Sequence, residues 1–280
     1  MPSRPATTFH LLLLVCLPLA ALAQPLFDAH LHYNAEDARQ YSPGQIIEIL
    51  KRTDVPAAVV TSRPPTQVLA LHALAPERIV PLLGVYRQPA DKETWHQDAT
   101  LPARVAEALA DRRWAGVGEL HLFAPQRHSP VFRRIVELAT ARGLPLQLHT
   151  DPATLDGVFD HAPGAVVLWA HAGAYPYPPL LRDYLARYPN LYIDLSVRDG
   201  RIAPGGRLDP AWEQLFLEYP ARFLVGVDTF STGRWGEYGV VAATIRHWLA
   251  ELPPEVAAAL ACGNAARLFD RPVCTPHPQP

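Results

Sequence analysis

The sequence has no run of basic residues and is poor in lysine. Its 280 residues carry 25 lysines and arginines against 27 aspartates and glutamates, which gives a formal net charge of −2. The only lysines are Lys51 and Lys92. Nucleic-acid-binding domains present clustered positive charge, because phosphate contacts need cations. The composition therefore argues against a nucleic-acid partner.

Long apolar runs are also absent, apart from one at the N-terminus. Arg4 and His10 precede the apolar run over residues 11–22, which ends in the small-x-small pattern Ala21-Leu22-Ala23. A membrane-spanning helix needs about 20 apolar residues, so this run is typical of a secretory signal peptide. We predict a signal peptide over residues 1–23, cleaved after Ala23. The mature protein is then periplasmic or secreted, without stable membrane association; an uncleaved anchor is the alternative.

Cysteine is scarce, and only Cys262 and Cys274 remain after such a cleavage. In an exported protein, two cysteines at this spacing are compatible with a disulfide. A buried, reduced Cys262 with a free thiol in the C-terminal tail is an equally good interpretation. The sequence leaves both open.

The mature chain shows a regular alternation of short apolar runs with helical patterns. Strands that are buried on both faces read as short apolar runs, and strands that alternate with helices form parallel sheets. Eight such units in about 250 residues favour a closed barrel over an open sheet. The predicted fold class is α/β, a single (β/α)8 TIM barrel over residues 24–270 with a Pro-rich tail over residues 271–280. The strands are expected at residues 26–33, 57–61, 79–86, 115–123, 144–150, 165–172, 191–197 and 223–228.

The first expected strand carries two histidines on one face. Side chains alternate across a strand, so Asp28, His30 and His32 share a face. Two adjacent imidazoles make a poor core but a good pair of metal ligands, since both neutral nitrogens can converge on one cation. Asp28 lies deeper along the strand and is expected to hydrogen-bond inside the barrel.

Other strands end in residues that also bind metals. In this fold the active site lies at the C-terminal ends of the strands. A metal site is therefore predicted at that end of the barrel. The residues that end the other strands are Glu119 and His121, His149, His171, and Asp228.

These motifs resemble the amidohydrolase superfamily of metal-dependent barrels, over essentially the whole mature chain. The motifs are Asp28-Ala-His-Leu-His32, Gly116-Val-Gly-Glu119, Leu148-His149, Ala170-His171-Ala-Gly173 and Gly226-Val-Asp228. The closing segment, residues 263–269, resembles the branch that also contains decarboxylases. The resemblance implies that His30, His32, His149, His171 and Asp228 are metal ligands. It also implies that Asp228 contacts the water that the metal activates and acts as its general base.

The fourth strand distinguishes subtypes of this superfamily. Many members bridge two metals with a carbamylated lysine there, and neither lysine of this chain is at that position. Glu119 is at the equivalent strand end and is predicted to contact metal there, where it could bridge two ions. The alternative is a carboxylate that supports the ligands or contacts the substrate beside a single metal. His121 shares its face and is expected at the rim rather than among the ligands.

Arginines near the strand ends are candidates for holding a substrate carboxylate or phosphate, because a guanidinium binds such groups bidentately. Arg87 and Arg198 are the predicted substrate-binding residues, and Arg63 is a weaker candidate. The alternative for each is a loop arginine that is solvated or ion-paired. Four aromatic residues could form an apolar wall: Trp95, Tyr175, Tyr177 and Trp235.

The leading hypothesis is an exported hydrolase of small molecules that directs a metal-activated water at an amide, ester, lactone or phosphoester. A second is a decarboxylase with one metal, for which Arg87 or Arg198 would hold the substrate carboxylate. A third is an exported metal-binding protein without catalysis. The expected cofactor is one or two divalent ions, with Zn²⁺ preferred, although Mn²⁺, Fe²⁺ and Co²⁺ suit the same ligands. A homo-oligomer is compatible with the sequence.

Overall fold

The computed structural model describes residues 24–274. The predicted signal peptide, residues 1–23, and the last six residues of the predicted tail, 275–280, lie outside the described residues. Within residues 24–274, no helix is both long enough and apolar enough to cross a membrane.

Eight parallel strands form one sheet in which each strand pairs with the next along the chain. The N–H of Ala29 donates to the carbonyl of Val225 at 2.9 Å, and the N–H of Asp228 donates to the carbonyl of His30 at 2.8 Å. These bonds join the first strand to the chain after the eighth, so the sheet closes into the predicted (β/α)8 barrel. The strands are β1 (Phe27–His32), β2 (Ala57–Thr61), β3 (Ile79–Leu83), β4 (Gly116–Leu122), β5 (Leu146–Thr150), β6 (Val167–Trp169), β7 (Leu191–Asp194) and β8 (Phe223–Leu224).

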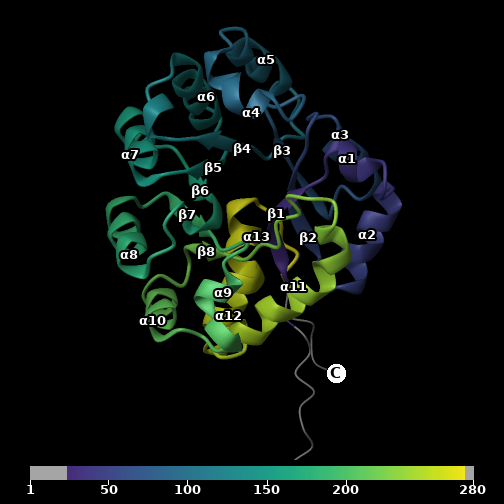
Figure 1. The fold of residues 1–280 in the computed structure, drawn as a ribbon, viewed down its shortest axis with the longest axis vertical. Helices are drawn as coiled ribbons and strands as arrows, with labels where there is room; N and C mark the ends of the chain where they lie inside the picture. Colours follow the sequence, from purple (N-terminus) through teal and green to yellow (C-terminus); the bar gives the residue numbers. More distant parts are fainter. Residues whose placement is uncertain (1–23, 275–280) are drawn as a thin grey trace, which may run out of the picture.

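Helices surround the strands (Figure 1). Their starts follow local chemistry: Ser42 accepts a hydrogen bond from the N–H of Gln45, and Pro43 takes the first helical position as predicted. The helices are α1 (Ala35–Ala38), α2 (Pro43–Arg52), α3 (Gln67–Leu74), α4 (Asp91–Thr94), α5 (Leu101–Ala108), α6 (Pro130–Thr140), α7 (Pro152–His161), α8 (Pro178–Arg187), α9 (Asp199–Ile202), α10 (Pro210–Glu218), α11 (Arg234–Leu249), α12 (Pro254–Ala258) and α13 (Asn264–Leu268). Single turns of 3₁₀ helix lie at Trp95–Gln97, Ala124–Gln126, Ala170–Ala172 and Pro204–Gly206, and a π turn lies at Ala259–Gly263.

Strands β6 and β8 are shorter than the sequence predicts. In both cases the chain leaves the sheet before it reaches the residue expected to bind metal. His171 has φ of 59° and Asp228 has φ of 56°, in the left-handed region that non-glycine residues rarely adopt. This backbone turn ends the ladder and directs each side chain toward the barrel mouth.

The closing helices are tied to the barrel wall and to the chain end. Asn264 donates from its amide to the carbonyls of Phe223, at 2.7 Å, and Pro220, at 2.8 Å. Cys262 and Cys274 form a disulfide, with their Cα atoms 5.7 Å apart. Of the two alternatives that the sequence left open, the disulfide is therefore the one present. It joins Cys274, which lies in the predicted Pro-rich tail, to Cys262.

Candidate metal centre

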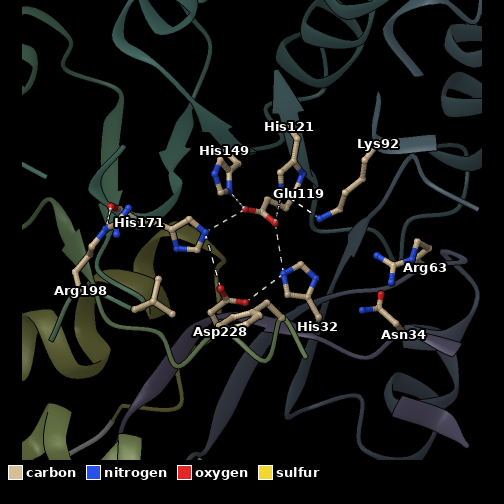
Figure 2. A pocket seen from close by; sticks show the side chains of 12 residues that line it. His32, Asn34, Arg63, Lys92, Glu119, His121, His149, His171, Arg198 and Asp228 are labelled. Atoms are coloured by element: carbon tan, nitrogen blue, oxygen red, sulfur yellow. Dashed lines mark hydrogen bonds and ion pairs between the residues drawn. The ribbon is translucent and has the colours of Figure 1, made fainter. Parts of the chain in front are cut away.

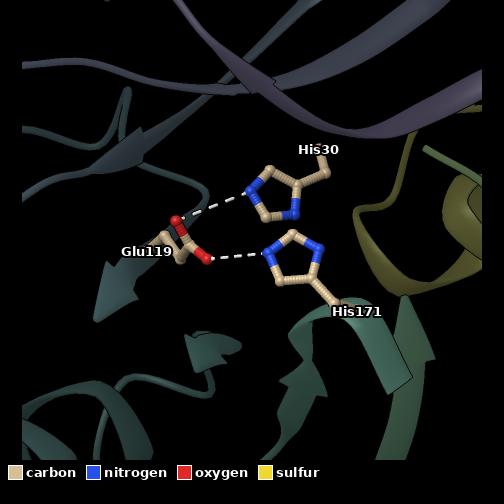
Figure 3. A group of neighbouring side chains, drawn as sticks. All are labelled: His30, Glu119 and His171. Atoms are coloured by element: carbon tan, nitrogen blue, oxygen red, sulfur yellow. Dashed lines mark ion pairs between the residues drawn. The ribbon is translucent and has the colours of Figure 1, made fainter. Parts of the chain in front are cut away.

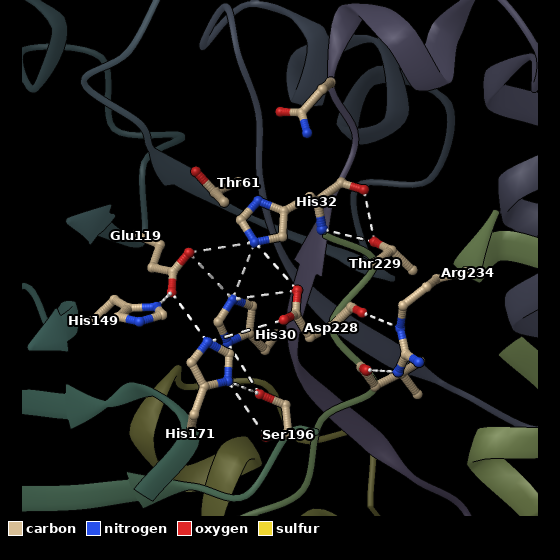
Figure 4. A network of polar contacts seen from close by, with 12 residues as sticks. His30, His32, Thr61, Glu119, His149, His171, Ser196, Asp228, Thr229 and Arg234 are labelled. Atoms are coloured by element: carbon tan, nitrogen blue, oxygen red, sulfur yellow. Dashed lines mark hydrogen bonds and ion pairs between the residues drawn. The ribbon is translucent and has the colours of Figure 1, made fainter. Parts of the chain in front are cut away.

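The two histidines of β1 lie at the centre of the site. The Nε2 atoms of His30 and His32 are only 3.2 Å apart, so both rings present a nitrogen to the same point. His30 is completely buried, and His32 is 9% exposed. The N–H of His32 donates to Oγ1 of Thr229 at 2.8 Å, which fixes the strand end against the loop after β8 (Figure 4). His30 and His32 thus converge on one point, as their placement on one face of the strand predicted.

Glu119, at the middle of β4, faces histidines from three other strands. Its Oε2 lies 3.4 Å from Nε2 of His32 and 3.7 Å from Nε2 of His30. Its Oε1 lies 2.9 Å from Nδ1 of His149 and 3.3 Å from Nε2 of His171. One carboxylate oxygen therefore faces the β1 pair, and the other faces His149 of β5 and His171, which follows β6. This is the arrangement that a bridging carboxylate requires.

His171 reaches the centre from the turn after β6. Its ring stacks on that of His30, with centroids 4.8 Å apart, and both rings face Glu119 (Figure 3). Its Nδ1 lies 2.9 Å from Oγ of Ser196, which leaves Nε2 directed at the carboxylate. The guanidinium of Arg198 donates to the carbonyls of His171, at 2.6 Å, and Gly173, at 3.1 Å, and so holds the turn itself.

Asp228 completes the group from the opposite side. Its Oδ1 lies 3.3 Å from Nε2 of His32 and 3.8 Å from Nε2 of His30. That oxygen is buried and has no hydrogen-bond partner among the described residues. A buried carboxylate oxygen without a donor is costly, unless a cation or water meets it. The atom is therefore suited to a metal ion or to a water beside one.

The charges of the cluster are balanced among its own members. Burial alone would lower the pKa of His30, but the carboxylates of Asp228, Asp194 and Glu119 raise it well above the ordinary value. Burial alone would raise the pKa of Glu119. The charges of His121 and His30, and hydrogen bonds from His149 and His171, instead hold that pKa well below its ordinary value. Burial is likewise outweighed at Asp228, where His30 and His32 lower the pKa to about 2.

This donor set fits a divalent metal. Imidazole nitrogens with carboxylate oxygens are the usual ligands of Zn²⁺ and related ions. The ligand atoms fall into three compact groups, within each of which all ligand atoms lie within 4.8 Å of one another. The groups are His30 with Glu119 and His171, His30 with His32 and Asp228, and Glu119 with His121 and His149.

Two buried carboxylates support the histidines from behind. Oδ2 of Asp194, the last residue of β7, lies 2.6 Å from Nδ1 of His30. Asp28 accepts hydrogen bonds from the N–H groups of His30 and Val227 and from the Tyr238 hydroxyl, as expected for an interior position. Sequence reasoning missed Asp194, although an acidic residue at the end of the seventh strand was a visible signal.

His121 and Lys92 form a contact at the rim. Nε2 of His121 lies 3.5 Å from Oε2 of Glu119, yet Nζ of Lys92 lies 3.2 Å from the same nitrogen. An ammonium group at that nitrogen competes with a metal for its lone pair, so His121 fits the rim position predicted for it. Lys92 itself was not among the predicted site residues. It lies on α4, beyond the end of β3, where no motif marks it.

Of the two predicted substrate arginines, Arg198 lines the pocket and Arg87 does not. The Arg87 side chain is 68% exposed, lies 3.9 Å from Asp91 and does not line the pocket, so its assignment as a substrate-binding residue does not fit the structure. Arg198 lines the pocket, but two of its nitrogens are bonded to the backbone after β6. The four aromatic candidates do not line the pocket either: Trp95 and Trp235 are buried, and Tyr175 and Tyr177 are exposed.

The ligands form the floor of a pocket of about 380 Å³ at the mouth of the barrel (Figure 2). A pocket of this size accommodates a small molecule. Besides the ligands, the lining residues include Asn34, Arg63, Lys92, His121, Val197, Arg198 and Phe230.

A family model described as amidohydrolase matches residues 27–271. The chain belongs to this amidohydrolase family. It is therefore an enzyme of the superfamily that the motifs resemble, a metal-dependent hydrolase or a related enzyme. No match was found among curated proteins.

Solved structures share the fold at low sequence identity. An amidohydrolase from Burkholderia multivorans with bound HEPES is 19% identical, with a TM-score of 0.56 over 89% of this chain and 100% of that one. A TatD homologue from Escherichia coli K12 is 18% identical, with a TM-score of 0.61 over 88% of this chain and 98% of that one. A probable 2-pyrone-4,6-dicarboxylic acid hydrolase from Acinetobacter baumannii with citric acid bound is 14% identical, with a TM-score of 0.58 over 88% of this chain and 100% of that one.

Proposed function

We propose that this protein is an exported hydrolase that uses a metal-activated water on an amide, ester, lactone or phosphoester of a small molecule. The observation that carries the proposal is the position of Asp228. Its Oδ1 is buried, lacks a hydrogen-bond partner within residues 24–274 and lies beside the two β1 histidines at the floor of the pocket. A carboxylate placed there can take a proton from an attacking water and return it to the leaving group.

The residues present would hold two divalent ions, for which Zn²⁺ is our first choice. His30, His32 and Asp228 would hold one, and His149 with His171 would hold the other. Glu119 would give one oxygen to each, because its Oε2 faces the first set and its Oε1 the second. When bound, such ions lower the pKa of a water molecule toward 7 and polarise the bond that is attacked.

The chain's own groups supply the rest of the reaction. Asp194 fixes the orientation of His30, and Ser196 that of His171, so the ligand nitrogens stay directed at one point. The pocket holds the substrate over this floor. Asp228 moves the proton, from the water to the leaving group of the substrate.

The alternative reaction is decarboxylation at a single ion, and the same ligands would serve it. The two-sided environment of Glu119 favours hydrolysis, because a carboxylate with histidines facing each oxygen suits two ions better than one. A metal-binding protein without catalysis is disfavoured for a different reason. The chain belongs to a family of amidohydrolases, and its ligands line a pocket large enough for a small molecule.

Two features support export. The first is the signal peptide predicted over residues 1–23. The second is the disulfide between Cys262 and Cys274, since disulfides persist mainly in oxidising compartments.

The proposal is tested with the metal-loaded mature protein on a panel of esters, lactones, amides, phosphoesters and aromatic carboxylic acids. We expect hydrolysis of one of the first four classes, with a loss of about 100-fold or more in turnover for Asp228→Asn. The exposed Asp183→Asn, which removes the same charge on α8, should be as active as wild type. Near wild-type turnover by Asp228→Asn would remove the role of Asp228. Release of carbon dioxide together with the decarboxylated acid, without any hydrolysis product, would establish the decarboxylase.

A further inference from the structure

Two cations on one side of the pocket have no carboxylate that fully neutralises them. Figure 2 shows Arg63 and Lys92 together with Asn34 on the side of the pocket away from Arg198. Arg63 follows β2, and Lys92 lies on α4 after β3, so two neighbouring loops bring them to the same wall.

The Lys92 ammonium has a histidine, not a carboxylate, as its partner. Its Nζ contacts Nε2 of His121 at 3.2 Å and forms no ion pair within the described part of the chain. The other ring nitrogen of His121 lies 3.3 Å from the hydroxyl of Tyr86, whose oxygen also accepts the N–H of His121 at 2.8 Å. His121 is thus held between a tyrosine and the lysine, and it fixes the ammonium at the pocket wall.

The Arg63 guanidinium is only loosely paired. Its one ion pair is with Glu36 at 3.5 Å, and the Glu36 side chain is 40% exposed. Exposed pairs at such distances contribute little. The Nε atom of Arg63 is buried and has no hydrogen-bond partner among residues 24–274. The backbone carbonyl of Arg63 accepts the N–H of Ala35 at 2.9 Å, which positions the residue.

The carboxylates of the pocket compensate for these charges only in part. Glu119 and Asp228 are the only carboxylates among the lining residues, and both face the histidine cluster. Burial lowers the pKa of Lys92, Glu119 opposes that shift, and the nearby charge of Arg63 lowers it further. Two cations that repel each other across one wall are stabilised when an anion lies between them.

We infer that Arg63 and Lys92 form a subsite for an oxyanionic group of the substrate, a carboxylate or a phosphate. This inference rests on the proposed function for its substrate, since it places the anionic group of that substrate beside the bond to be hydrolysed. The fork of Arg63 offers directed donors, and Lys92 adds a compact charge. Arg198 lines the opposite side of the pocket, and Arg87 does not line the pocket.

Binding is measured by calorimetry on the metal-loaded mature protein at fixed ionic strength. The probes are succinate, inorganic phosphate and succinamide, the uncharged amide of the same shape as succinate. We expect wild type to bind succinate or phosphate at least 10-fold more tightly than succinamide. Whichever anion binds more tightly identifies the group that the subsite prefers.

Arg63→Met and Lys92→Met are each expected to weaken binding of that anion by about 10- to 100-fold, the loss of one hydrogen bond to a charged group. Lys92→Arg should retain most of the affinity. Anions that bind only to the metal will bind wild type and both variants equally. Metal content is measured in each protein. If Lys92→Met alters the metal content, Arg63→Met decides the result, because Arg63 touches none of the metal ligands.

Equal affinity of wild type for succinate and succinamide would overturn the inference, and so would unchanged anion affinity in both methionine variants. Neither result depends on turnover. A protein that binds anions through Arg63 and Lys92 but hydrolyses nothing would keep the subsite and remove the proposed function. A hydrolase that Asp228→Asn impairs, but whose anion affinity is unchanged in Arg63→Met and Lys92→Met, would keep the proposed function and remove the subsite.

Discussion

Nδ1 of His30 lies 2.6 Å from Oδ2 of Asp194, and both side chains are completely buried. The carboxylate accepts a hydrogen bond from the N–H at Nδ1, so Nε2, which points to Glu119 and Asp228, is the nitrogen whose lone pair is available to a metal. Asp194 is itself held by the N–H and the hydroxyl of Ser196, each at 2.8 Å. A carboxylate that orients a metal-binding histidine in this way also raises its basicity.

We therefore expect Asp194→Asn to weaken metal binding by about 10- to 100-fold. An asparagine amide that donates to Nδ1 would favour the tautomer with the proton on Nε2, where the metal must bind. Competition against a chromophoric chelator measures the affinity. Asp183→Asn, on the surface of α8, is the matched control and should bind metal as wild type does. Equal affinity for Asp194→Asn would show that Asp194 only fills the barrel floor.

Glu119→Ala should change how many ions each chain holds. If Glu119 gives one oxygen to each of two ions, its removal leaves three ligands at one position, His30, His32 and Asp228, and only two histidines at the other. We expect wild type to hold two ions per chain and Glu119→Ala to hold one, as measured by elemental analysis after dialysis. One ion in both proteins would place Glu119 beside a single metal and put the decarboxylase on an equal footing with the hydrolase.

Metal removal should destabilise the fold. The ligands come from five parts of the barrel: strands β1, β4 and β5, and the turns after β6 and β8. Ions that bind them therefore stabilise the folded state only. At a free metal concentration 100 times the dissociation constant, the gain is about 2.7 kcal/mol. For a domain of this size, that corresponds to a fall of about 5–10 °C in Tm on chelation. Differential scanning calorimetry with and without chelator measures the fall, and re-addition of Zn²⁺ should reverse it. An unchanged Tm would mean that metal and fold are not coupled.

The sequence determines the barrel better than it determines the barrel mouth. Strands buried on both faces and helix caps such as Ser42 are set by local residue types, so eight units are predictable from the chain alone. The left-handed turns at His171 and Asp228 are not, because no glycine marks them and tertiary contacts impose them. Even so, the sequence places both residues at the correct end of the barrel, although each lies beyond the last residue of its strand.

Long side chains in loops are the least predictable part of the site. Lys92 reaches the pocket from α4, and only the barrel geometry brings it to His121. Arg87 lies five residues before it and turns outward, because its N–H bonds Asp91 at 2.8 Å and its guanidinium stays in solvent. No local sequence pattern indicates that Lys92 faces the pocket and Arg87 faces solvent.

Asp199 supplies a prediction on pH that is independent of the metal. It lies at the start of α9, and its carboxylate accepts the indole N–H of Trp248 at 2.9 Å. Burial raises the pKa of Asp199 above the ordinary value, and the Trp248 hydrogen bond only partly opposes this. The folded state therefore binds the proton more tightly than the unfolded state, so stability falls as pH rises from about 4 through the folded pKa, and the loss persists at neutral pH.

Asp199→Asn keeps the acceptor for Trp248 without the charge. We expect it to raise Tm at pH 7 and to lose much of that advantage toward pH 4, where a growing fraction of the aspartate is protonated. Thermal unfolding from pH 4 to pH 8 tests this, with the exposed Asp183→Asn as the control for net charge. A gain that is the same at every pH would show that the substitution acts through packing rather than through the buried charge.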